Sequence, residues 1–322
     1  MVVVLFLLNL FIGSVDIPAR DVMEILLGDD THGAAGFIVM GSRLPMAVTA
    51  LLAGAGLAVS GLMLQTSFRN PLAGPSILGI TSGASLGVAL VLLFFGGSVA
   101  IGTLSIGGYA AVILGAFVGS MLMMGVLLGL SSLLRNDLML LITGIMMGYL
   151  ASSLIMLLNY ASTAEGVQNY VMWGMSSFNG VSMRQLPLFA GITLAGIFIS
   201  LLLIKPLNVM LLGAGYAANL GVNINRVRNM LLLATGLLSA VITAYCGPVS
   251  FIGLAVPHIA RLIFRTDNHR VLMPATLMCG AAVALGCSLM CILPKGFVIP
   301  VNAVTPVIGA PVVLWVLLRR RK

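Results

Sequence analysis

Charged residues are scarce in this chain of 322 residues, where Asp, Glu, Lys and Arg together make up only 7% while 60% of the residues are hydrophobic. Soluble domains carry roughly a quarter charged residues, so a soluble globular fold is excluded. Apolar runs of about 20 residues, separated by short polar breaks, are typical of helices that cross a bilayer. The alternating polarity of a membrane β-barrel is absent. The composition therefore predicts an all-α, polytopic membrane protein with the lipid bilayer as a partner.

Acidic residues are especially few, at 8, and none lies near the middle of an apolar run. Asp137, Glu165 and Asp267 all fall at the ends of such runs. Carriers driven by proton or sodium gradients commonly hold acids inside the membrane. The absence counts against an ion-coupled secondary transporter, which stays the alternative function because backbone carbonyls also bind sodium.

Sequence signals for enzymatic chemistry are weak. The chain has no G-x-x-x-x-G-K-[ST] phosphate loop, so it does not bind ATP in that manner and any energy from ATP must come through a partner. Residues 83–87 match the G-x-S-x-G pattern of serine hydrolases, but Ser85 falls inside a predicted helix rather than at a strand-to-helix turn. We therefore expect no enzyme and no catalytic residue, and an intramembrane hydrolase is the weakest reading.

Metal and cofactor signals are also lacking. The 4 cysteines lie in or beside apolar runs without the paired spacing of a zinc or iron-sulfur site, so they are predicted to pack as apolar residues: Cys246, Cys279, Cys287 and Cys291. His258 lies in a Pro- and Gly-containing stretch, and a haem-ligand role has no second feature to support it. We expect no metal site and no cofactor bound by this chain.

Apolar length and turn residues predict ten spans in one transmembrane domain that covers residues 1–322. The first run resembles a signal-peptide core but lacks a basic region and a small-residue cleavage site, so it is predicted to remain as a helix. Similar sequences at residues 51–57 and 232–237 suggest an inverted repeat of five-helix period. The predicted spans are 1–15, 45–66, 77–96, 106–131, 138–160, 186–204, 229–246, 250–265, 271–292 and 302–318.

The basic residues predict the orientation in the membrane. With the N-terminus in the cytoplasm, all but Arg20, Arg43, Arg184 and Lys295 of the 16 basic residues fall on the inner side. Lys and Arg are enriched in cytoplasmic loops, so both termini are predicted to be cytoplasmic. This bias also explains the net charge of +8, and no nucleic-acid partner is expected.

Three loops are long enough to hold structure. Outside, residues 16–44 contain an amphipathic stretch at residues 22–27, and residues 161–185 contain Tyr170 and Trp173, which suit a short helix at the membrane interface. Inside, residues 205–228 carry three glycines that permit tight turns. Glycines at four-residue spacing predict close helix packing at four pairs: 83 and 87, 115 and 119, 125 and 129, and 144 and 148.

Several long motifs occur in order along nearly the whole chain. They are RLP at residues 43–45, FRNPLAGP at 68–75, LGITSGA at 78–84, LGV at 220–222, the stretch 247–261 and VTPVIGAP at 304–311. By these motifs the chain resembles the FecCD family, the permease subunits of type II ABC importers for iron-siderophores, haem and cobalamin. No feature of the sequence separates these substrates, and an iron-siderophore is taken as the first expectation.

The resemblance implies a BtuC-like permease fold in the bacterial inner membrane. It further implies a homodimer with one pathway along its two-fold axis, two cytoplasmic ATPase subunits that use ATP and Mg, and an outer substrate-binding protein. Such a permease passes a bulky metal chelate into the cytoplasm without changing it. Methionine is frequent, at 20 residues, and methionines on the fifth span could form an adaptable wall, although lipid or core packing explains them as well.

Site residues follow from the same resemblance. Arg43 would meet the binding protein, although Met46 stands where family members often carry a second arginine. A further arginine of some members falls near Cys291, and Lys295, one helical turn away, would substitute for it. Acidic residues of the family are likewise absent at two positions of the ATPase-coupling segment, where Ala214 and Gly215 stand. That segment comprises Leu212, Gly213, Ala214, Gly215, Ala217, Leu220 and Gly221. The inner gate and pathway would include Asn70, Leu72, Asn136, Asp137, Met146 and Asn159.

Overall fold

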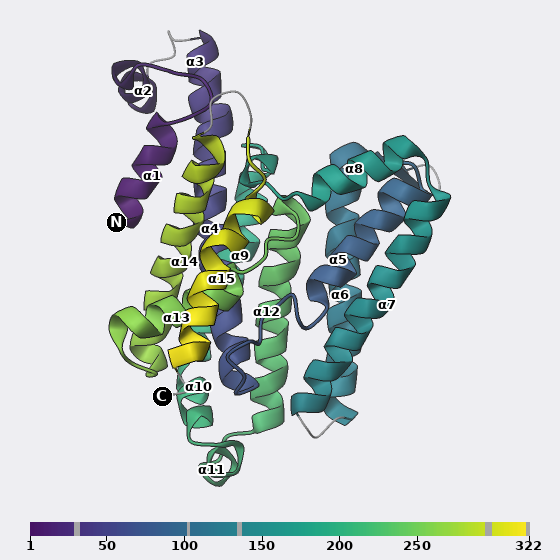
Figure 1. Cartoon of the computed structure of the whole chain (residues 1–322), viewed down its shortest axis with the longest axis vertical. Helices are drawn as coiled ribbons and strands as arrows, with labels where there is room; N and C mark the ends of the chain where they lie inside the picture. Colours follow the sequence, from purple (N-terminus) through teal and green to yellow (C-terminus); the bar gives the residue numbers. More distant parts are fainter. Residues whose placement is uncertain (29–32, 102–103, 134–136, 294–297, 320–322) are drawn as a thin grey trace.

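The computed structural model describes residues 1–28, 33–101, 104–133, 137–293 and 298–319. Each of the ten predicted spans coincides with a helix, so the predicted all-helical membrane fold is confirmed. These helices are α1 (Val2–Phe11), α4 (Leu44–Ser67), α5 (Ile80–Ala89) with its extension η3 (Leu90–Phe94), α6 (Gly108–Leu133), α7 (Asp137–Ala161), α9 (Leu186–Leu202), α12 (Ile224–Cys246), α13 (Ile252–Phe264), α14 (His269–Ile292) and α15 (Val301–Arg319). Figure 1 shows the longer of these helices, such as α4, α12 and α14, running between two ends of the molecule.

Helix length varies among these elements. In the described part of the chain, five helices are long and apolar enough to cross a membrane, and a sixth span results if α9 is joined to α10 (Ile204–Leu211), from which it is bent by 47°. The other four, α1, α5 with η3, α13 and α15, are shorter apolar helices. The shorter α13 follows a non-helical stretch that begins with Gly247 at φ 76°, a conformation that glycine adopts readily.

Short helices lie at the two ends of the bundle (Figure 1). At one end are α2 (Ala19–Leu26), α3 (Gly33–Ile38) with η2 (Val39–Arg43), α8 (Ala164–Gly174) and η4 (Phe178–Gly180); at the other are α10 and α11 (Ala214–Asn219). The predicted amphipathic stretch is confirmed in α2, where Val22 and Ile25 are buried. The predicted interfacial helix is α8, whose first turn is capped by Thr163 accepting from the Gly166 backbone N–H.

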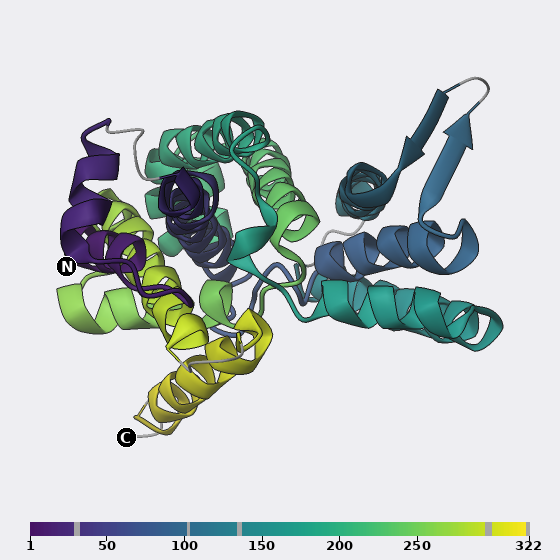
Figure 2. The ribbon, with the colours of Figure 1, turned by 90° about the horizontal axis from the view of Figure 1, so that it is seen from above.

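One element was not predicted from the sequence. Strands β1 (Ser98–Ile101) and β2 (Leu104–Gly107) pair antiparallel, with Ser98 opposite Gly107, where a plain loop was expected. Gly97 and Gly108 flank the pair with φ of 85° and 63°. Glycine enters this left-handed region at little cost, so the chain can turn into and out of the hairpin. Figure 2 shows the hairpin projecting beside α5 and α6.

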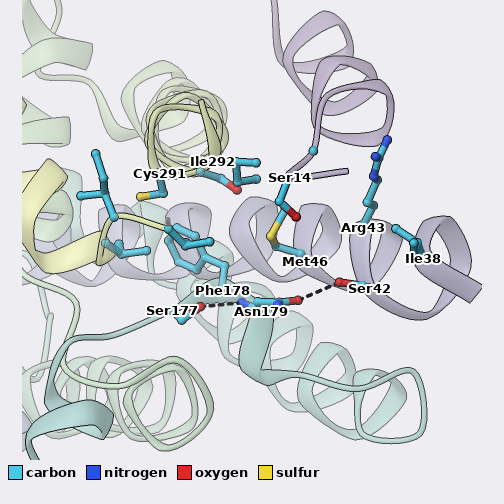
Figure 3. A pocket seen from close by; sticks show the side chains of 15 residues that line it. Ser14, Ile38, Ser42, Arg43, Met46, Ser177, Phe178, Asn179, Cys291 and Ile292 are labelled. Carbon is cyan, nitrogen blue, oxygen red and sulfur yellow. Dashed lines mark hydrogen bonds between the residues drawn. The ribbon is translucent and has the colours of Figure 1, made fainter. Parts of the chain in front are cut away.

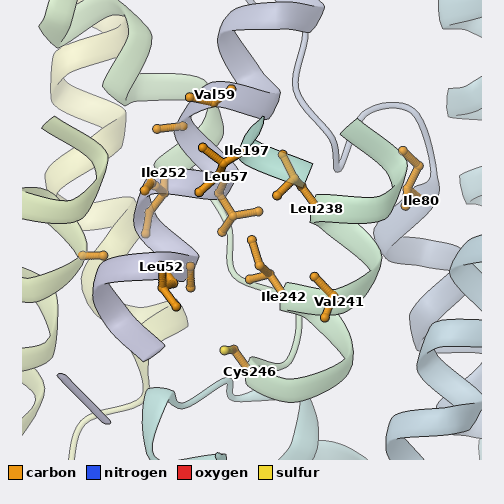
Figure 4. Packing of buried hydrophobic residues seen from close by; sticks show 14 of the residues in the cluster. Leu52, Leu57, Val59, Ile80, Ile197, Leu238, Val241, Ile242, Cys246 and Ile252 are labelled. Carbon is orange, nitrogen blue, oxygen red and sulfur yellow. The ribbon is translucent and has the colours of Figure 1, made fainter. Parts of the chain in front are cut away.

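Helix α4 is the centre of the larger group of helices. It contacts α14, α13, α12 and α9, and its residues 52–67 are buried without interruption. Figure 4 shows the apolar side chains of α4 and α13, such as Leu57 and Ile252, packed in one cluster with Leu238 and Ile242 of α12. Helices α5, α6 and α7 form a second group that lies to one side in Figure 2 and joins the first mainly through α12. Helices α4 and α12 run in opposite directions (Figure 1), as an inverted repeat requires.

Glycines bring the helix backbones into contact. A Cβ at Gly61 of α4 would lie 1.6 Å from the Gly253 carbonyl oxygen of α13, and a Cβ at Gly54 would lie 2.3 Å from the Gly280 carbonyl oxygen of α14. The predicted pairs at 83, 87, 115 and 119 pack α5 on α6, and Gly144 packs α7 on Leu78. Close packing at the pair 125 and 129 is wrong within the described chain, because a Cβ at either position meets nothing within 4 Å.

The α4–α14 contact predicts a position-dependent effect along α14. Gly280→Ala forces the two backbones apart and should destabilise the protein by about 1–3 kcal/mol, the usual cost of overpacking. Gly286→Ala on the same helix meets no atom within 4 Å, so it should be neutral or slightly stabilising through helix propensity. Thermal unfolding in detergent measures both, and equal midpoints would contradict the packing.

Candidate functional site

The segment between α4 and α5, residues 68–79, is called here the inner segment. Its turn is held by Asn70, whose side-chain oxygen accepts the Leu72 backbone N–H at 2.9 Å. His258 of α13 bonds through Nε2 to the Pro71 carbonyl at 2.8 Å. This ring nitrogen therefore has a partner within the protein. Leu72 is exposed. The prolines separate two helices as predicted, and the gate roles of Asn70 and Leu72 stay predictions.

Arg69 has a role that the sequence did not indicate beyond orientation. Its φ is 45°, and its guanidinium donates to the Met210 carbonyl of α10 at 3.3 Å. Arg69 also borders a polar cavity of about 250 Å³ with Gln65 and Arg261. There Arg261 donates to the Gln65 side-chain oxygen at 2.7 Å and pairs with Asp267 at 3.2 Å. The inner segment is thus tied to α10 through Arg69.

The predicted coupling residues form the end of the molecule at α11, called here the coupling segment (residues 212–221). Gly213 and Gly221 bracket α11 with φ of 115° and 80°, so the chain turns sharply at both ends. Ala217 is fully buried, whereas Leu212 and Leu220 are exposed. Ala214 and Gly215 form the first turn of α11. The expected residues are therefore brought together in one protruding feature (Figure 1).

Tyr216 completes this surface, with 67% of the residue exposed beside Leu220 at 59%. The sequence interpretation did not include it. Leu212 precedes α11 and Leu220 follows it, and both are exposed as Tyr216 is. The result is an exposed apolar patch at the tip of the segment.

At the opposite end, Arg43 differs from expectation. The residue is only 3% exposed, and its guanidinium donates to the carbonyls of Leu10 and Phe11 at 2.9 Å each and to that of Val15. The last carbonyls of α1 have no partner within the helix, and a cation at a helix C-terminus is favourable. Arg43 is therefore directed inward as a cap for α1, which corrects the expectation of an outward-facing side chain. Lys295 lies outside the described residues.

Arg43 and the two residues compared with further arginines of the family line one cavity. Arg43, Met46 and Cys291 all border a pocket of about 280 Å³, shown in Figure 3. Its polar rim includes Ser42, whose hydroxyl donates to the Asn179 side-chain oxygen at 3.1 Å. With a methionine and a cysteine in place of arginines, the pocket carries little charge apart from the capped Arg43.

The expected pathway residues on α7 share a helix but not a pocket. Met146 is 54% exposed. The Asn159 side-chain amide donates a hydrogen bond to the Ile155 carbonyl of the same helix at 3.0 Å. Asp137 begins α7, and Asn136 lies outside the described residues. Most of α7 presents apolar side chains that no described part of the chain covers, including Leu150 and Leu157.

Asn302 of α15 is a site residue that sequence reasoning missed. Its amide donates to the carbonyls of Pro248 and Gly174, and its oxygen accepts the Ser250 N–H at 3.1 Å. It thus joins α15, the end of α8 and the stretch before α13. Asn in an apolar span is a recognisable signal, but its partners are distant in sequence.

Enzymatic and metal chemistry find little support in the described residues. They contain no group of three or more His, Cys, Asp or Glu side chains that could hold a metal ion. The four cysteines are all buried and none forms a disulfide. Ser85 lies inside α5 and not on a strand-to-helix elbow.

Comparisons with known proteins define the class. The model of the FecCD transport family matches residues 1–319. The vitamin B12 import system permease protein BtuC of Klebsiella pneumoniae is 37% identical over 281 residues, 87% of this chain and 82% of that protein. BtuC of Yersinia enterocolitica is 37% identical over 86% of this chain and 80% of its own length, and that of Shigella boydii is 34% identical over 92% and 89%.

Comparison with solved structures supports the same class of protein. An inward-facing conformation of a metal-chelate type ABC transporter matches with a TM-score of 0.85 at 29% identity, covering 99% of this chain and 96% of that one. PsaBC from Streptococcus pneumoniae, in complex with Fab, shares the fold alone, with a TM-score of 0.55 at 12% identity. The fold is therefore that of an ABC transporter permease. The chain belongs to the FecCD transport family.

The burial of Arg43 predicts a stability defect. Arg43→Glu would place a carboxylate against three carbonyl oxygens and remove their donor, which should cost about 3 kcal/mol or more because buried acceptors lose their partner. Arg184→Glu, at an exposed position near the same end, should change stability by no more than about 0.5 kcal/mol. Thermal unfolding measures both. Unchanged stability of Arg43→Glu, with weaker docking of a binding protein, would restore the outward-facing role.

Proposed function

We propose that this chain is the membrane subunit of an ATP-driven importer that passes a bulky metal chelate across the bacterial inner membrane. The support is membership of the FecCD transport family over residues 1–319. The chain hydrolyses no ATP itself and makes no chemical change to the substrate. ATP and Mg are used by two cytoplasmic ATPase subunits, and a substrate-binding protein delivers the chelate from outside.

The end at α11 is assigned to the cytoplasm. Basic residues occur at the helix ends on this side, including Arg69 after α4, Arg226 and Arg228 in the first turn of α12, and Arg265 after α13. Arg20 and Arg184 belong to the opposite end, with α2 and α8. The positive-inside bias therefore favours an inner end at α11. The C-terminus lies at this end (Figure 1), and both termini are predicted to be cytoplasmic.

The observation that carries the proposal is the exposed apolar tip of the coupling segment. A water-facing segment gains little from exposing Tyr216 of α11 together with Leu212 and Leu220, which lie on either side of this helix. Exposed apolar patches at aqueous ends are typical of protein–protein contacts. An ATPase that closes on ATP could push on this tip and rock the helices between outward and inward access. Because acidic side chains are absent at residues 214 and 215, the contact rests on shape and apolar burial.

A second copy of the chain is the proposed cover for α7. Met146, Leu150 and Leu157 leave its apolar face open along the membrane. Placed against its equivalent in a homodimer, this face would line a pathway between the copies. An apolar, methionine-containing wall binds weakly and adapts in shape, which suits passage of a bulky solute.

The substrate class is assigned from the relatives. Those named above carry the name of vitamin B12 import, and the solved neighbour is a metal-chelate type transporter. Cobalamin is therefore the first substrate to test, with an iron-siderophore, the first expectation from the sequence, and haem as the others.

The proposal is tested in proteoliposomes that contain the chain with ATPase and binding-protein subunits encoded beside it. Uptake of cobalamin, ferric siderophore and haem is compared with ATP, with a non-hydrolysable analogue and with an imposed ion gradient. ATP-dependent uptake of one chelate is expected. Uptake driven by the gradient without ATP would favour the secondary-transporter alternative and overturn the proposal.

Substitution at the tip should weaken ATPase binding selectively. Leu220→Ser removes an apolar side chain whose burial is worth about 1.5–3 kcal/mol, so the affinity for the ATPase should fall about tenfold or more. Leu27→Ser is the control, because Leu27 is also an exposed leucine but lies at the opposite end, after α2. Binding is measured with purified subunits. An equal effect of both substitutions would contradict the assignment of this surface.

A further inference from the structure

We infer that His269 is a positioning residue that joins α10 to α4 and α14 and thereby carries movement of the coupling segment to the inner segment. The inference rests on the proposed function, since it concerns how ATP-driven movement reaches the gate. Three helices that are distant in sequence meet at this one side chain, which is 0% exposed.

The contacts of His269 are specific on every side. Its backbone N–H donates to the Asn208 side-chain oxygen of α10 at 2.8 Å, and its Nδ1 lies 3.0 Å from the same oxygen. Its Nε2 lies 2.9 Å from the hydroxyl of Thr66, in the last turn of α4. The residue itself opens α14.

Neighbouring hydrogen bonds determine the direction of each contact. The Asn268 side-chain oxygen accepts the Arg270 backbone N–H at 3.0 Å as the cap of α14. The Asn208 amide nitrogen donates to that same oxygen at 2.9 Å, so the oxygen of Asn208 faces His269. A carboxamide oxygen only accepts, and therefore Nδ1 of His269 carries a proton. In the neutral ring, Nε2 is then an acceptor for the Thr66 hydroxyl.

Thr66 has two acceptors for one proton. Its hydroxyl lies 2.9 Å from the Leu62 carbonyl of its own helix as well as 2.9 Å from His269. If α14 and α10 move away, the hydroxyl can turn back to Leu62, so no buried donor is left unsatisfied. When the link between α4 and His269 opens, only the Nε2 acceptor of His269 loses its partner, so opening costs about one hydrogen bond.

The position of the contact connects the two functional segments. Asn208 lies on α10, which ends at Leu211, immediately before the coupling segment. Thr66 lies at the end of α4, immediately before the inner segment. Helix α10 is bent by 47° from α9, so the preceding helix does not constrain it as a straight rod. Arg69 adds a second tie between the inner segment and α10 through the Met210 carbonyl.

The test compares two buried threonines. Thr66 and Thr276 each bond to the carbonyl four residues earlier, at 2.9 and 2.7 Å, but only Thr66 also reaches His269. Valine has nearly the same shape, so Thr66→Val removes the link with little change in packing. Asn208→Ala removes the link from the α10 side. The complex with ATPases and binding protein is reconstituted for each variant, and substrate transported per ATP hydrolysed is measured beside the ATPase rate and subunit assembly.

The expected result is a fall in substrate per ATP of about fivefold for Thr66→Val and Asn208→Ala, the scale of a modest coupling between sites. Assembly and the ATPase rate should stay within about twofold, and Thr276→Val should resemble the wild type. An unchanged yield per ATP in both test variants overturns the inference, as does loss of assembly in either or an equal fall in Thr276→Val. Absence of ATP-driven uptake by the wild-type complex instead overturns the proposed function, and this inference falls with it.

Discussion

Contact between helix backbones is the constraint on which this structure depends. In hydrocarbon every backbone N–H and C=O must be satisfied within the protein, so the spans are helices. Apolar side chains gain little by leaving lipid for one another, and close packing must hold the helices together. Glycine supplies it where α4 meets α14 at Gly54 and Gly280, and where α4 meets α13 at Gly61 and Gly253. These glycine contacts fix the central helix to two neighbours, in addition to the hydrogen bonds at its inner end.

This packing leaves the polar chemistry to the two ends of the bundle. At the outer end, Arg43 satisfies the carbonyls at the end of α1. At the inner end, Arg261, His269 and Thr66 form hydrogen bonds among α4, α10, α13 and α14. Hydrogen bonds can exchange partners when helices move. Helices that meet at glycines cannot slide past one another without losing their close packing. Movement driven from the coupling segment is therefore expected to pass through the polar inner end while the glycine contacts move as a body.

The helices could be predicted from the sequence because the length and period of an apolar run are local properties. A helix was found at each of the ten predicted spans, and the helices α2 and α8 were also predicted. Properties that depend on distant partners were not. The partners of Arg43 are carbonyls 28 to 33 residues away, so the motif at residues 43–45 identified the position but not the direction of its side chain. Asn302 was missed for the same reason, since its partner Gly174 lies 128 residues away. The hairpin at residues 98–107 has strands of only four residues, too short for a clear alternating pattern.

The candidate site was predicted in part for a physical reason as well. The coupling segment is local, so its residues came together as expected and only Tyr216 was missed. The residues of α7 face away from the described chain, and their use depends on a second copy that no local pattern describes. Gly125 and Gly129 show the same limit, because four-residue spacing indicates a surface for close approach but not whether a neighbour occupies it.

The central claim is that ATP binding to the ATPase subunits acts through the coupling segment and moves the inner segment. The most direct measurement places a spin label at Leu72 through Leu72→Cys, which is selective because all four native cysteines are buried. The distance between the labels of the two copies is recorded in the assembled transporter with and without ATP. The account predicts a clear shift of this distance on ATP binding. An unchanged distance in a transporter that still imports its substrate would contradict it.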